Sequence, residues 1–470
     1  MPKKIHLISF IHAAASSMAY GQWKDTEDKL AREYTDPNFW VKTAQTLERG
    51  GFDAIFFADA HGVKDVYRGS YEASVKSGMQ FPACDPILVA AAIARETKTI
   101  GLIVTWSAGY FPPYHTARLF STLDHLTNGR AGWNVVTSYL SAGLKNGMGD
   151  NIPHDERYDR ADEYMDVVYK LWEKSWDDDA VVLDKQTSTY ADPTRVHKIN
   201  HKGKYYSVEG PHQSEPSRQR TPFIVQAGGS PRGNAFAGKH AEAVFMVCMS
   251  IADAAKSTKK LREATAAAGR DPSSVKALLQ VSCIVAETEA EAQAKVAHFL
   301  ELADVDGSLS LLGGHTDIDF SKFRSDQALS GLESGGITTI GKFFSGVGGS
   351  DKWTFGDMCE YLKLSYLCPT IVGTPEQVAD ALEKWIDEAD VDGFVLAPVQ
   401  TPSSYEDFVD LVVPELRKRG RLNDVGEIST LRERFTGSEK IAADHHAHSV
   451  SIDDAIARGR RARVTGRKAS

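Results

Sequence analysis

The sequence is poor in cysteine, lacks long apolar runs and has no excess of basic residues, and each absence excludes a class of protein. The five cysteines are scattered, odd in number and without a C-x-x-C pair. We therefore expect reduced thiols in a cytoplasmic protein rather than a disulfide framework or a zinc site. No run of about 18 apolar residues occurs, so no membrane span is predicted. The formal net charge of −9 argues against nucleic acid as a partner.

Motifs for several familiar kinds of catalysis are also missing. The chain has no G-x-x-x-x-G-K-[ST] phosphate loop, no G-x-G-x-x-G after a predicted strand and no G-x-S-x-G nucleophile turn. His154 and Asp155 have no second histidine three or four residues away, so we predict no metal site. Because no nucleophile or acid–base pair stands out, a bound cofactor is expected to supply the reactive chemistry.

Short apolar stretches alternate with helical patterns along the chain, which predicts an α/β fold with parallel strands. Two helices are predicted to begin at Asp-Pro pairs, at Asp36 and Asp85, and a capping box opens another at Thr374. Eight strand–helix pairs favour a (β/α)8 TIM barrel, with a doubly wound sheet as the alternative. The predicted strands are residues 4–10, 52–58, 99–106, 131–137, 222–226, 243–247, 277–286 and 393–397.

The regular alternation is interrupted twice, which predicts insertions after strands 4 and 7. The first covers about residues 139–220 and holds many polar and turn residues. The second, about residues 301–352, is rich in glycine and serine and is predicted to be a lid. We expect the barrel to occupy residues 1–435 and residues 436–470 to form a C-terminal arm or tail.

Polar residues gather where predicted strands end. Asp59 follows strand 2, and Asn134, Thr137 and Ser138 lie at the end of strand 4. In a parallel barrel such strand ends share one mouth, where ligands bind. The Gly-Gly-Ser turn at residues 228–230 precedes a helix and is a candidate phosphate cradle. Each feature also has a plain structural explanation, namely a core strand with a polar exit and a tight turn that needs glycine.

The densest polar run is residues 154–164. The acid-rich first turn of a solvated helix explains most of it. In a second interpretation, the phenol of Tyr158 points at a phosphate or at the edge of a flavin.

Several of these stretches together resemble one family, the luciferase-like, reduced-flavin-dependent monooxygenases. The resemblance is to the branch of nitrilotriacetate, dibenzothiophene sulfone, dimethyl sulfide and long-chain alkane monooxygenases, and a riboflavin-degrading lyase is also similar. The match extends from about residue 4 to residue 432. The stretches that carry it are residues 52–59, 123–130, 133–138, 154–158, 224–230 and 372–375.

The resemblance implies a TIM barrel that binds FMNH₂, which a separate NAD(P)H-dependent flavin reductase supplies. Dioxygen then reacts with the flavin, and the flavin–oxygen adduct oxidises the substrate. It also implies which residues lie nearest the chemistry: His12, Gln80, Asn134 and Tyr139. The flavin contacts implied by the resemblance are Asp59, Gln80, Asn134, Thr137, Ser138, Tyr158, Ala227, Gly228, Gly229 and Ser230.

The chemistry of these residue types is compatible with the roles that the resemblance implies. Asp59, Gln80 and Asn134 have the donors and acceptors that hydrogen-bond the polar edge of a flavin ring. The phosphate would be held by Ser138, Tyr158 and Ser230 together with the amides of residues 228–229. Apolar strand walls would keep water from the reacting flavin. The substrate side would be shaped by His12, Ala14, Ser17, Trp106, Tyr110 and Tyr139.

Three functions remain open from the sequence. The first is a two-component FMNH₂-dependent monooxygenase that oxidises a small organic substrate. The second is oxidative C–N cleavage of a heteroaromatic such as riboflavin. The third is a flavin-binding barrel without turnover. The family implies a homodimer or homotetramer, with a small-molecule substrate and the flavin reductase as partners.

Overall fold

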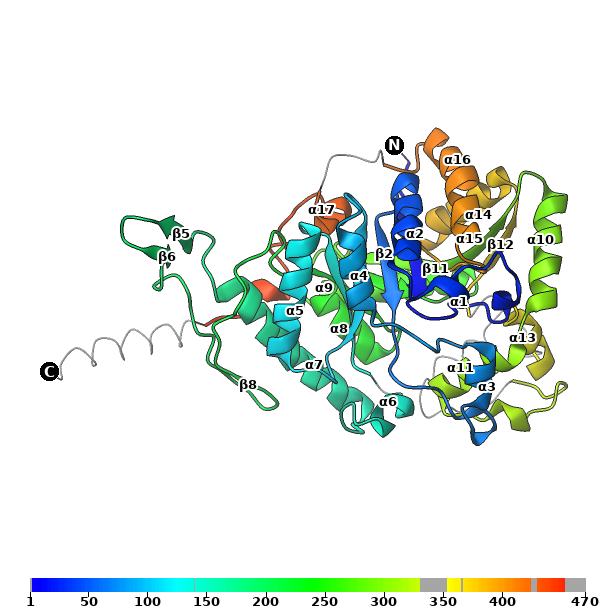
Figure 1. Cartoon of the computed structure of the whole chain (residues 1–470), viewed down its shortest axis with the longest axis horizontal. Coiled ribbons are helices and arrows are strands. Elements are labelled where there is room, and N and C mark those ends of the chain that lie inside the picture. The colour runs from blue at the N-terminus through cyan, green and yellow to red at the C-terminus, as the bar shows by residue number, and fades with distance from the viewer. Residues whose placement is uncertain (1, 139, 330–352, 365–366, 424–428, 453–470) are drawn as a thin grey trace.

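Eight parallel strands close into a barrel in the computed structural model, which describes residues 2–138, 140–329, 353–364, 367–423 and 429–452 (Figure 1). β1 pairs with β13 and β10 pairs with β11, so the ring has no free edge and the predicted TIM barrel is confirmed over the doubly wound sheet. The barrel strands are β1 (His6–His12), β2 (Ala54–Ala58), β3 (Gly101–Ser107), β4 (Ala131–Val136), β9 (Phe223–Ala227), β10 (Ala243–Met246), β11 (Lys276–Val285) and β13 (Gly393–Leu396).

Helices surround the strand ring, and their starts follow from local sequence. The side chains of Asp36 and Asp85 accept hydrogen bonds from the second helical residue, and Thr374 forms the predicted capping box with Gln377. No helix among the described residues is both long and apolar enough to cross a membrane. The outer helices are α2 (Pro37–Gly50), α4 (Pro86–Ala94), α5 (Pro113–Thr127), α7 (His154–Tyr169), α8 (Pro231–His240), α9 (Ile251–Ala267), α14 (Pro375–Ala389), and the continuous α15 (Ser403–Asp407), η6 (Phe408–Val412) and α16 (Val413–Lys418).

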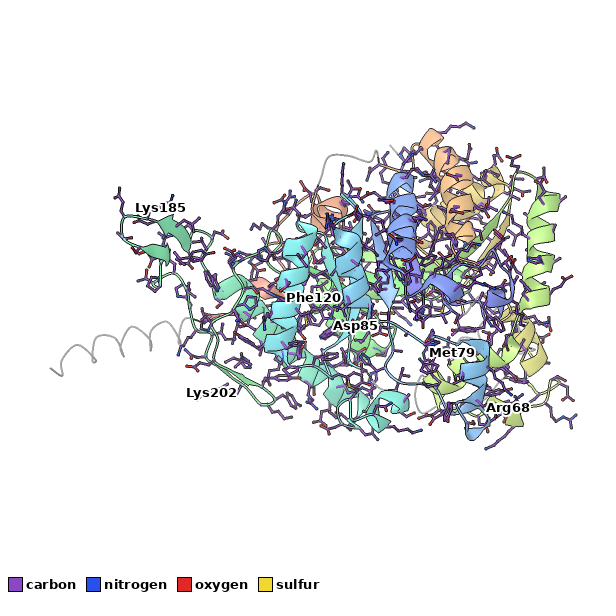
Figure 2. The ribbon with its side chains drawn as sticks, viewed as in Figure 1. Arg68, Met79, Asp85, Phe120, Lys185 and Lys202 are labelled. Atoms are coloured by element: carbon purple, nitrogen blue, oxygen red, sulfur yellow. The ribbon has the colours of Figure 1, made fainter. Side chains whose placement is uncertain are left out.

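The predicted insertion after β4 contains two small antiparallel hairpins. One of them, β5 (Val181–Asp184) with β6 (Thr189–Ala191), projects from the body of the molecule (Figure 1). Lys185 lies at the far end of this projection and Lys202 lies on the second hairpin (Figure 2). The remaining elements here are α6 (Ser141–Lys145), η3 (Lys170–Lys174), β7 (His201–Lys202) and β8 (Ser207–Val208).

The second insertion differs from the predicted glycine-rich lid over part of its length. Residues 305–316 form a helix, α11 (Val305–Thr316), and residues 330–352 lie outside the described residues. The glycines of α11 permit close packing instead of a loop, because a Cβ on Gly307 would lie 2.8 Å from Ser77 Cβ of α3 (Glu72–Ser77). The neighbouring elements are α10 (Glu289–Leu302), η4 (Phe320–Lys322), α13 (Phe355–Tyr361) and β12 (Thr370–Gly373), which pairs with β11.

Short elements also fill the loops near the barrel mouth. They are η1 (Gln22–Lys24), α1 (Leu30–Glu33) and η2 (Tyr67–Gly69). The first strand itself is shifted from its expected range. β1 ends at His12, two residues later than predicted, so His12 belongs to the barrel wall rather than to the following loop.

The amino-terminal end of the barrel is closed by a helix from the far end of the chain, α17 (Leu431–Thr436). Phe435 stacks on His6 and Phe223 with ring centroids 4.1 Å and 4.8 Å apart. Leu431 fills the space beside Gly101 and Gly132, since a Cβ on Gly132 would lie 3.1 Å from its Cδ2. This end of the barrel is therefore sealed by apolar side chains, and only the opposite end offers a mouth.

Residues 436–470 were predicted to form an arm or tail. Up to residue 452, the structure instead packs this segment against the barrel. His445 is buried and its Nε2 lies 2.9 Å from the carbonyl oxygen of His240, while Ala447 is fully buried. Ile441 adds an apolar contact to the main core. The chain after α17 thus packs on the barrel, and residues 453–470 lie outside the described residues.

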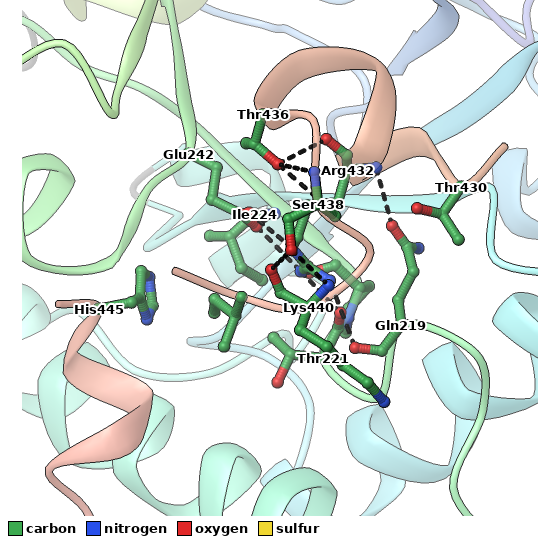
Figure 3. A network of polar contacts seen from close by, with 12 residues as sticks. Gln219, Thr221, Ile224, Glu242, Thr430, Arg432, Thr436, Ser438, Lys440 and His445 are labelled. Carbon is green, nitrogen blue, oxygen red and sulfur yellow. Dashed lines mark hydrogen bonds and ion pairs between the residues drawn. The ribbon is translucent and has the colours of Figure 1, made fainter. Parts of the chain in front are cut away.

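A buried ion pair holds the α17 plug in place (Figure 3). The Arg432 guanidinium is fully buried, and its Nε lies 2.6 Å from Glu242 Oε1. The same guanidinium donates to the carbonyl oxygens of Gln219, Thr221 and Pro222. The N–H donors of the guanidinium all have acceptors, which is the condition under which a buried charge is tolerated.

We predict that Arg432→Met strands the Glu242 carboxylate in the core and lowers the free energy of unfolding by about 3–5 kcal/mol. Denaturant unfolding followed by circular dichroism measures the loss. The double variant Arg432→Met/Glu242→Leu should recover most of it, because no uncompensated charge remains. Arg324→Ala, at an exposed pair with Asp326, should leave the unfolding midpoint unchanged. Equal loss in the single and double variants would contradict this role for the pair.

Candidate active site

The carboxyl ends of the parallel strands bring most of the predicted site residues to one rim. In register, His12 of β1 lies beside Ala58 of β2, and Thr105 of β3 lies beside Asn134 of β4. The loop from β9 to α8 continues the same rim with the Gly-Gly-Ser turn at residues 228–230. Gln80 arrives from the loop after α3, and Tyr158 from α7. Tyr139 lies outside the described residues.

Asn134 presents an unused hydrogen-bond acceptor inside the barrel. Its Nδ2 donates to Thr105 Oγ1 at 3.0 Å, which orients the amide. Its Oδ1 is buried and has no partner. Because buried polar atoms in proteins are nearly always hydrogen-bonded, this orphaned acceptor at the mouth is a candidate hydrogen-bonding position for a ligand. Gln280 of β11 has a buried Nε2 in the same condition.

Below these amides, the barrel interior is aromatic and apolar. Phe56 lies between Phe10 and Phe245, with ring centroids 5.3 Å and 4.3 Å away. All three rings are nearly fully buried. The mouth therefore has a dry floor, on which electrostatic interactions are stronger than in water.

Asp59 and Gln80 add polar groups on the β2 side of the mouth. Burial raises the pKa of the Asp59 carboxyl above its usual range. Gln80 accepts a hydrogen bond at Oε1 from Lys64 Nζ at 3.2 Å. Its Nε2 lies 3.4 Å from the Tyr20 hydroxyl. These contacts fix the orientation of the Gln80 amide.

The turn after β9 forms a cradle at the N-terminus of α8. Ser230 caps the helix by accepting from Gly233 N at 3.0 Å, and its Oγ lies 3.4 Å from His154 Nε2. A Cβ on Gly228 would lie 3.2 Å from the Tyr158 hydroxyl. Free amides at a helix start, with hydroxyls beside them, bind phosphate. Burial raises the pKa of Tyr158, so its phenol stays protonated as a donor.

Arg232 does not supply the positive charge of this cradle. Its guanidinium is paired with Asp159 at 2.9 Å and Asp162 at 2.5 Å. Ser138 lies on the β4 side, where its Oγ donates to Ser107 Oγ at 2.7 Å. Thr137 is half-buried next to it. The cradle is thus built mainly of amides, hydroxyls and the helix dipole.

The substrate-side residues divide into two groups. His12 faces inward, is only 7% exposed, and has an unpartnered Nδ1, and Ser17 has an unpartnered buried Oγ. Trp106 was expected on the substrate side, and the structure contradicts this. Successive side chains of a strand point to opposite faces, and that of Trp106 points away from the barrel interior. Its indole stacks on Phe111 with centroids 4.0 Å apart and donates to Thr116 on α5, so it packs outside the barrel.

Sequence patterns gave no signal for Lys64, Thr105 or Gln280. Lys64 lies in a loop, and a lysine there is usually solvated, yet this one is 3% exposed. Thr105 and Gln280 face the barrel interior among apolar neighbours. A recognisable signal for them would have required the strand register, which sets the inward face.

The structure is a (β/α)8 barrel whose mouth combines buried polar side chains, an apolar floor and the N-terminus of α8. The chain belongs to the luciferase-like monooxygenase family, whose model matches residues 17–393, and is accordingly an oxidoreductase.

Relatives support the same assignment over almost the whole chain. Dimethyl-sulfide monooxygenase of Hyphomicrobium sulfonivorans is 44% identical over 95% of this chain and 94% of its own, and its crystal structure superposes with a TM-score of 0.90. Long-chain alkane monooxygenase of Geobacillus thermodenitrificans is 42% identical over 95% of this chain and 98% of its own. A riboflavin lyase, solved with modified FMN and riboflavin, is 34% identical over 95% of this chain and 99% of its own, with a TM-score of 0.87.

We predict that Thr105→Val leaves both polar atoms of the Asn134 amide unpaired and destabilises the protein by about 1–3 kcal/mol. The double variant Thr105→Val/Asn134→Leu replaces both partners by apolar groups, and should recover most of that stability. Thermal unfolding of the two variants measures the difference. A double variant no more stable than the single one would show that this hydrogen bond does not orient Asn134.

Proposed function

We propose that the protein is the oxygenase component of a two-component system that uses reduced FMN and dioxygen to oxidise a small organic molecule. The observation that carries the proposal is the buried, unpartnered Oδ1 of Asn134 on the same rim as the phosphate cradle at Ser230. An FMN needs ring-edge partners and a phosphate site at once, and the mouth offers both.

The residues present fit an FMN. Asn134 and Gln80 offer amide groups to the polar edge of the ring, and Asp59 accompanies them on the β2 side. Ser230, the amides after Gly228 and the Tyr158 phenol hold the phosphate. A side chain at Gly228 would occupy part of this cradle, since its Cβ would lie 3.2 Å from the Tyr158 hydroxyl.

When bound, reduced FMN supplies the electrons that activate dioxygen for transfer of one oxygen atom to the substrate. The chain contributes positioning and the exclusion of water. The floor of Phe10, Phe56 and Phe245 keeps the reacting face dry. His12 lies over this floor, and burial lowers its pKa to about 3, so it is a neutral hydrogen-bonding group at physiological pH.

The partners follow from what the chain contains. Because no G-x-G-x-x-G follows a strand, we assign the oxidation of NAD(P)H to a separate flavin reductase. The projecting β5–β6 hairpin exposes Val182, Leu183 and Tyr190, each by 45% or more, which favours a homodimer or homotetramer built on this arm. None of the five cysteines, all of which lie in the described part of the chain, forms a disulfide, which suits a cytoplasmic enzyme.

The phosphate cradle is tested with Ser230→Ala. Loss of the hydroxyl should weaken FMN binding about tenfold, while binding of riboflavin, which lacks the phosphate, stays unchanged. Fluorescence titration with both flavins measures this. Ser250→Ala is the matched control, because Ser250 caps α9 in the same way and should affect stability without changing FMN affinity. Equal weakening of FMN and riboflavin would place the phosphate elsewhere.

Turnover is tested by oxygen uptake with FMNH₂ and a panel of organosulfur, amine and alkane substrates, corrected for peroxide. Substrate-dependent uptake that Asn134→Ala abolishes is the expected result. Riboflavin belongs in the panel, because the similarity to riboflavin lyase makes C–N cleavage the second candidate, and bleaching of its yellow colour would favour that reaction. FMN binding without any substrate-dependent uptake would contradict both and favour a flavin-binding barrel.

A further inference from the structure

A buried lysine lies on the side of the mouth opposite the phosphate cradle. Lys64 is 3% exposed, and it faces His12 of β1, Gln80 and His315 of α11, whose ring the Lys64 charge also affects. In the closed ring of strands, β1 and β9 are four strands apart in either direction. The Lys64 cluster, meaning Lys64, His12, His315 and Gln80, therefore lies across the barrel from Ser230.

The fold holds Lys64 in this position by packing. A Cβ on Gly314 of α11 would collide with Lys64 Cγ, so only a glycine lets the two segments approach this closely. Ser74 of α3 donates its hydroxyl to the Lys64 carbonyl oxygen at 2.7 Å and meets Ser310 Oγ of α11 at 2.7 Å. Neither the stem nor the backbone of Lys64 is free to carry its ammonium to solvent.

The ammonium has no paired anion in the cluster. Among the described residues, Lys64 forms no ion pair with a carboxylate, and its ammonium makes one hydrogen bond, to Gln80 Oε1 at 3.2 Å. An ammonium has three donors, so two remain. The nearest acidic influence is Asp59, which acts at longer range and opposes the effect of burial on Lys64.

The two histidines carry no charge of their own beside the Lys64 ammonium. Burial lowers the pKa of His12 and of His315 to about 3, so both rings are neutral at physiological pH. Burial also lowers the pKa of Lys64, to about 8, so most of it remains charged at pH 7. His12 Nδ1 is buried without a partner. The cluster thus combines one cation, unused donors and an unpaired ring nitrogen around the substrate side.

We propose that Lys64 is the specificity-determining residue of this enzyme, and that its ammonium binds the carboxylate of a small anionic organic substrate. The inference rests on the proposed function, because the same mouth has to hold FMN. A buried, unpaired cation is costly, and an entering carboxylate satisfies both the charge and the free donors. A neutral substrate would leave them unsatisfied, so the site discriminates against it.

The test compares probes that differ only in charge. They are 3-(methylthio)propanoate with its alcohol, 3-(methylthio)propanol, and hexanoate with hexanol. Isothermal titration of the FMN-loaded protein should give at least one carboxylate bound about tenfold more tightly than its alcohol. Lys64→Gln should remove this preference, and Lys64→Arg should keep part of it. Lys185→Gln, at the tip of the projecting hairpin (Figure 2), should leave the preference intact.

The outcomes separate this proposal from the proposed function. FMN affinity is measured first. If the unaltered protein does not bind FMN, the proposed FMN binding is refuted, and the carboxylate titration is then repeated without flavin. If Lys64→Gln weakens FMN binding as much as carboxylate binding, the ammonium serves the cofactor and the proposal is wrong. Equal affinity for acid and alcohol in the unaltered protein overturns it as well. Lys64→Arg covers the case in which Lys64→Gln fails to fold.

Discussion

Closure of a ring of parallel strands is the constraint on which the rest of this structure depends. Once β1 pairs with β13 and β10 with β11, every backbone ladder is satisfied and every strand runs in the same direction. All carboxyl ends then face one rim, and all amino ends the other. One rim gathers the polar loops of the site, while the other exposes an apolar core that has to be covered.

The chain covers that second rim with α17, a helix some 35 residues after the last barrel strand. Leu431 and Phe435 supply apolar contacts, and the Arg432–Glu242 pair ties the helix to the loop before β10. A sealed base also serves the mouth. Water cannot enter the barrel from below, so the apolar floor under Asn134 stays dry and its orphaned acceptor stays available to a ligand.

Two sets of buried polar groups in this molecule differ in their pairing. At the base, Arg130 donates to the carbonyl oxygens of Thr127, Ile100, Ala94 and Thr97, and Arg432 is paired just as fully. At the mouth, Asn134, His12 and Lys64 keep unused donors or acceptors. Since both sets are buried, the difference is not one of solvent access. Fully paired groups stabilise the fold, and the unpaired ones at the mouth are the groups that we propose to contact a ligand.

Local patterns were sufficient for the elements whose formation depends on neighbours in the chain. The helix starts at Asp36, Asp85 and Thr374 come from side chains that reach the next turn, and the barrel strands come from short apolar runs. Local patterns did not predict that residues 305–316 form a helix. Its glycines resemble a loop until the approach of α3 is known, because close packing rather than flexibility requires them.

The sequence by itself determined the strand count, the helix caps and which polar residues stand at strand ends, because hydrogen bonding and burial periodicity are local properties. Only the tertiary structure decided that Trp106 faces outward, that Lys64 is buried beside His12, and that α17 closes the base. These outcomes depend on strand register and on contacts between segments that are dozens to hundreds of residues apart. The burial of a charged loop residue such as Lys64 cannot be predicted from its neighbours in the chain, because distant segments bury it.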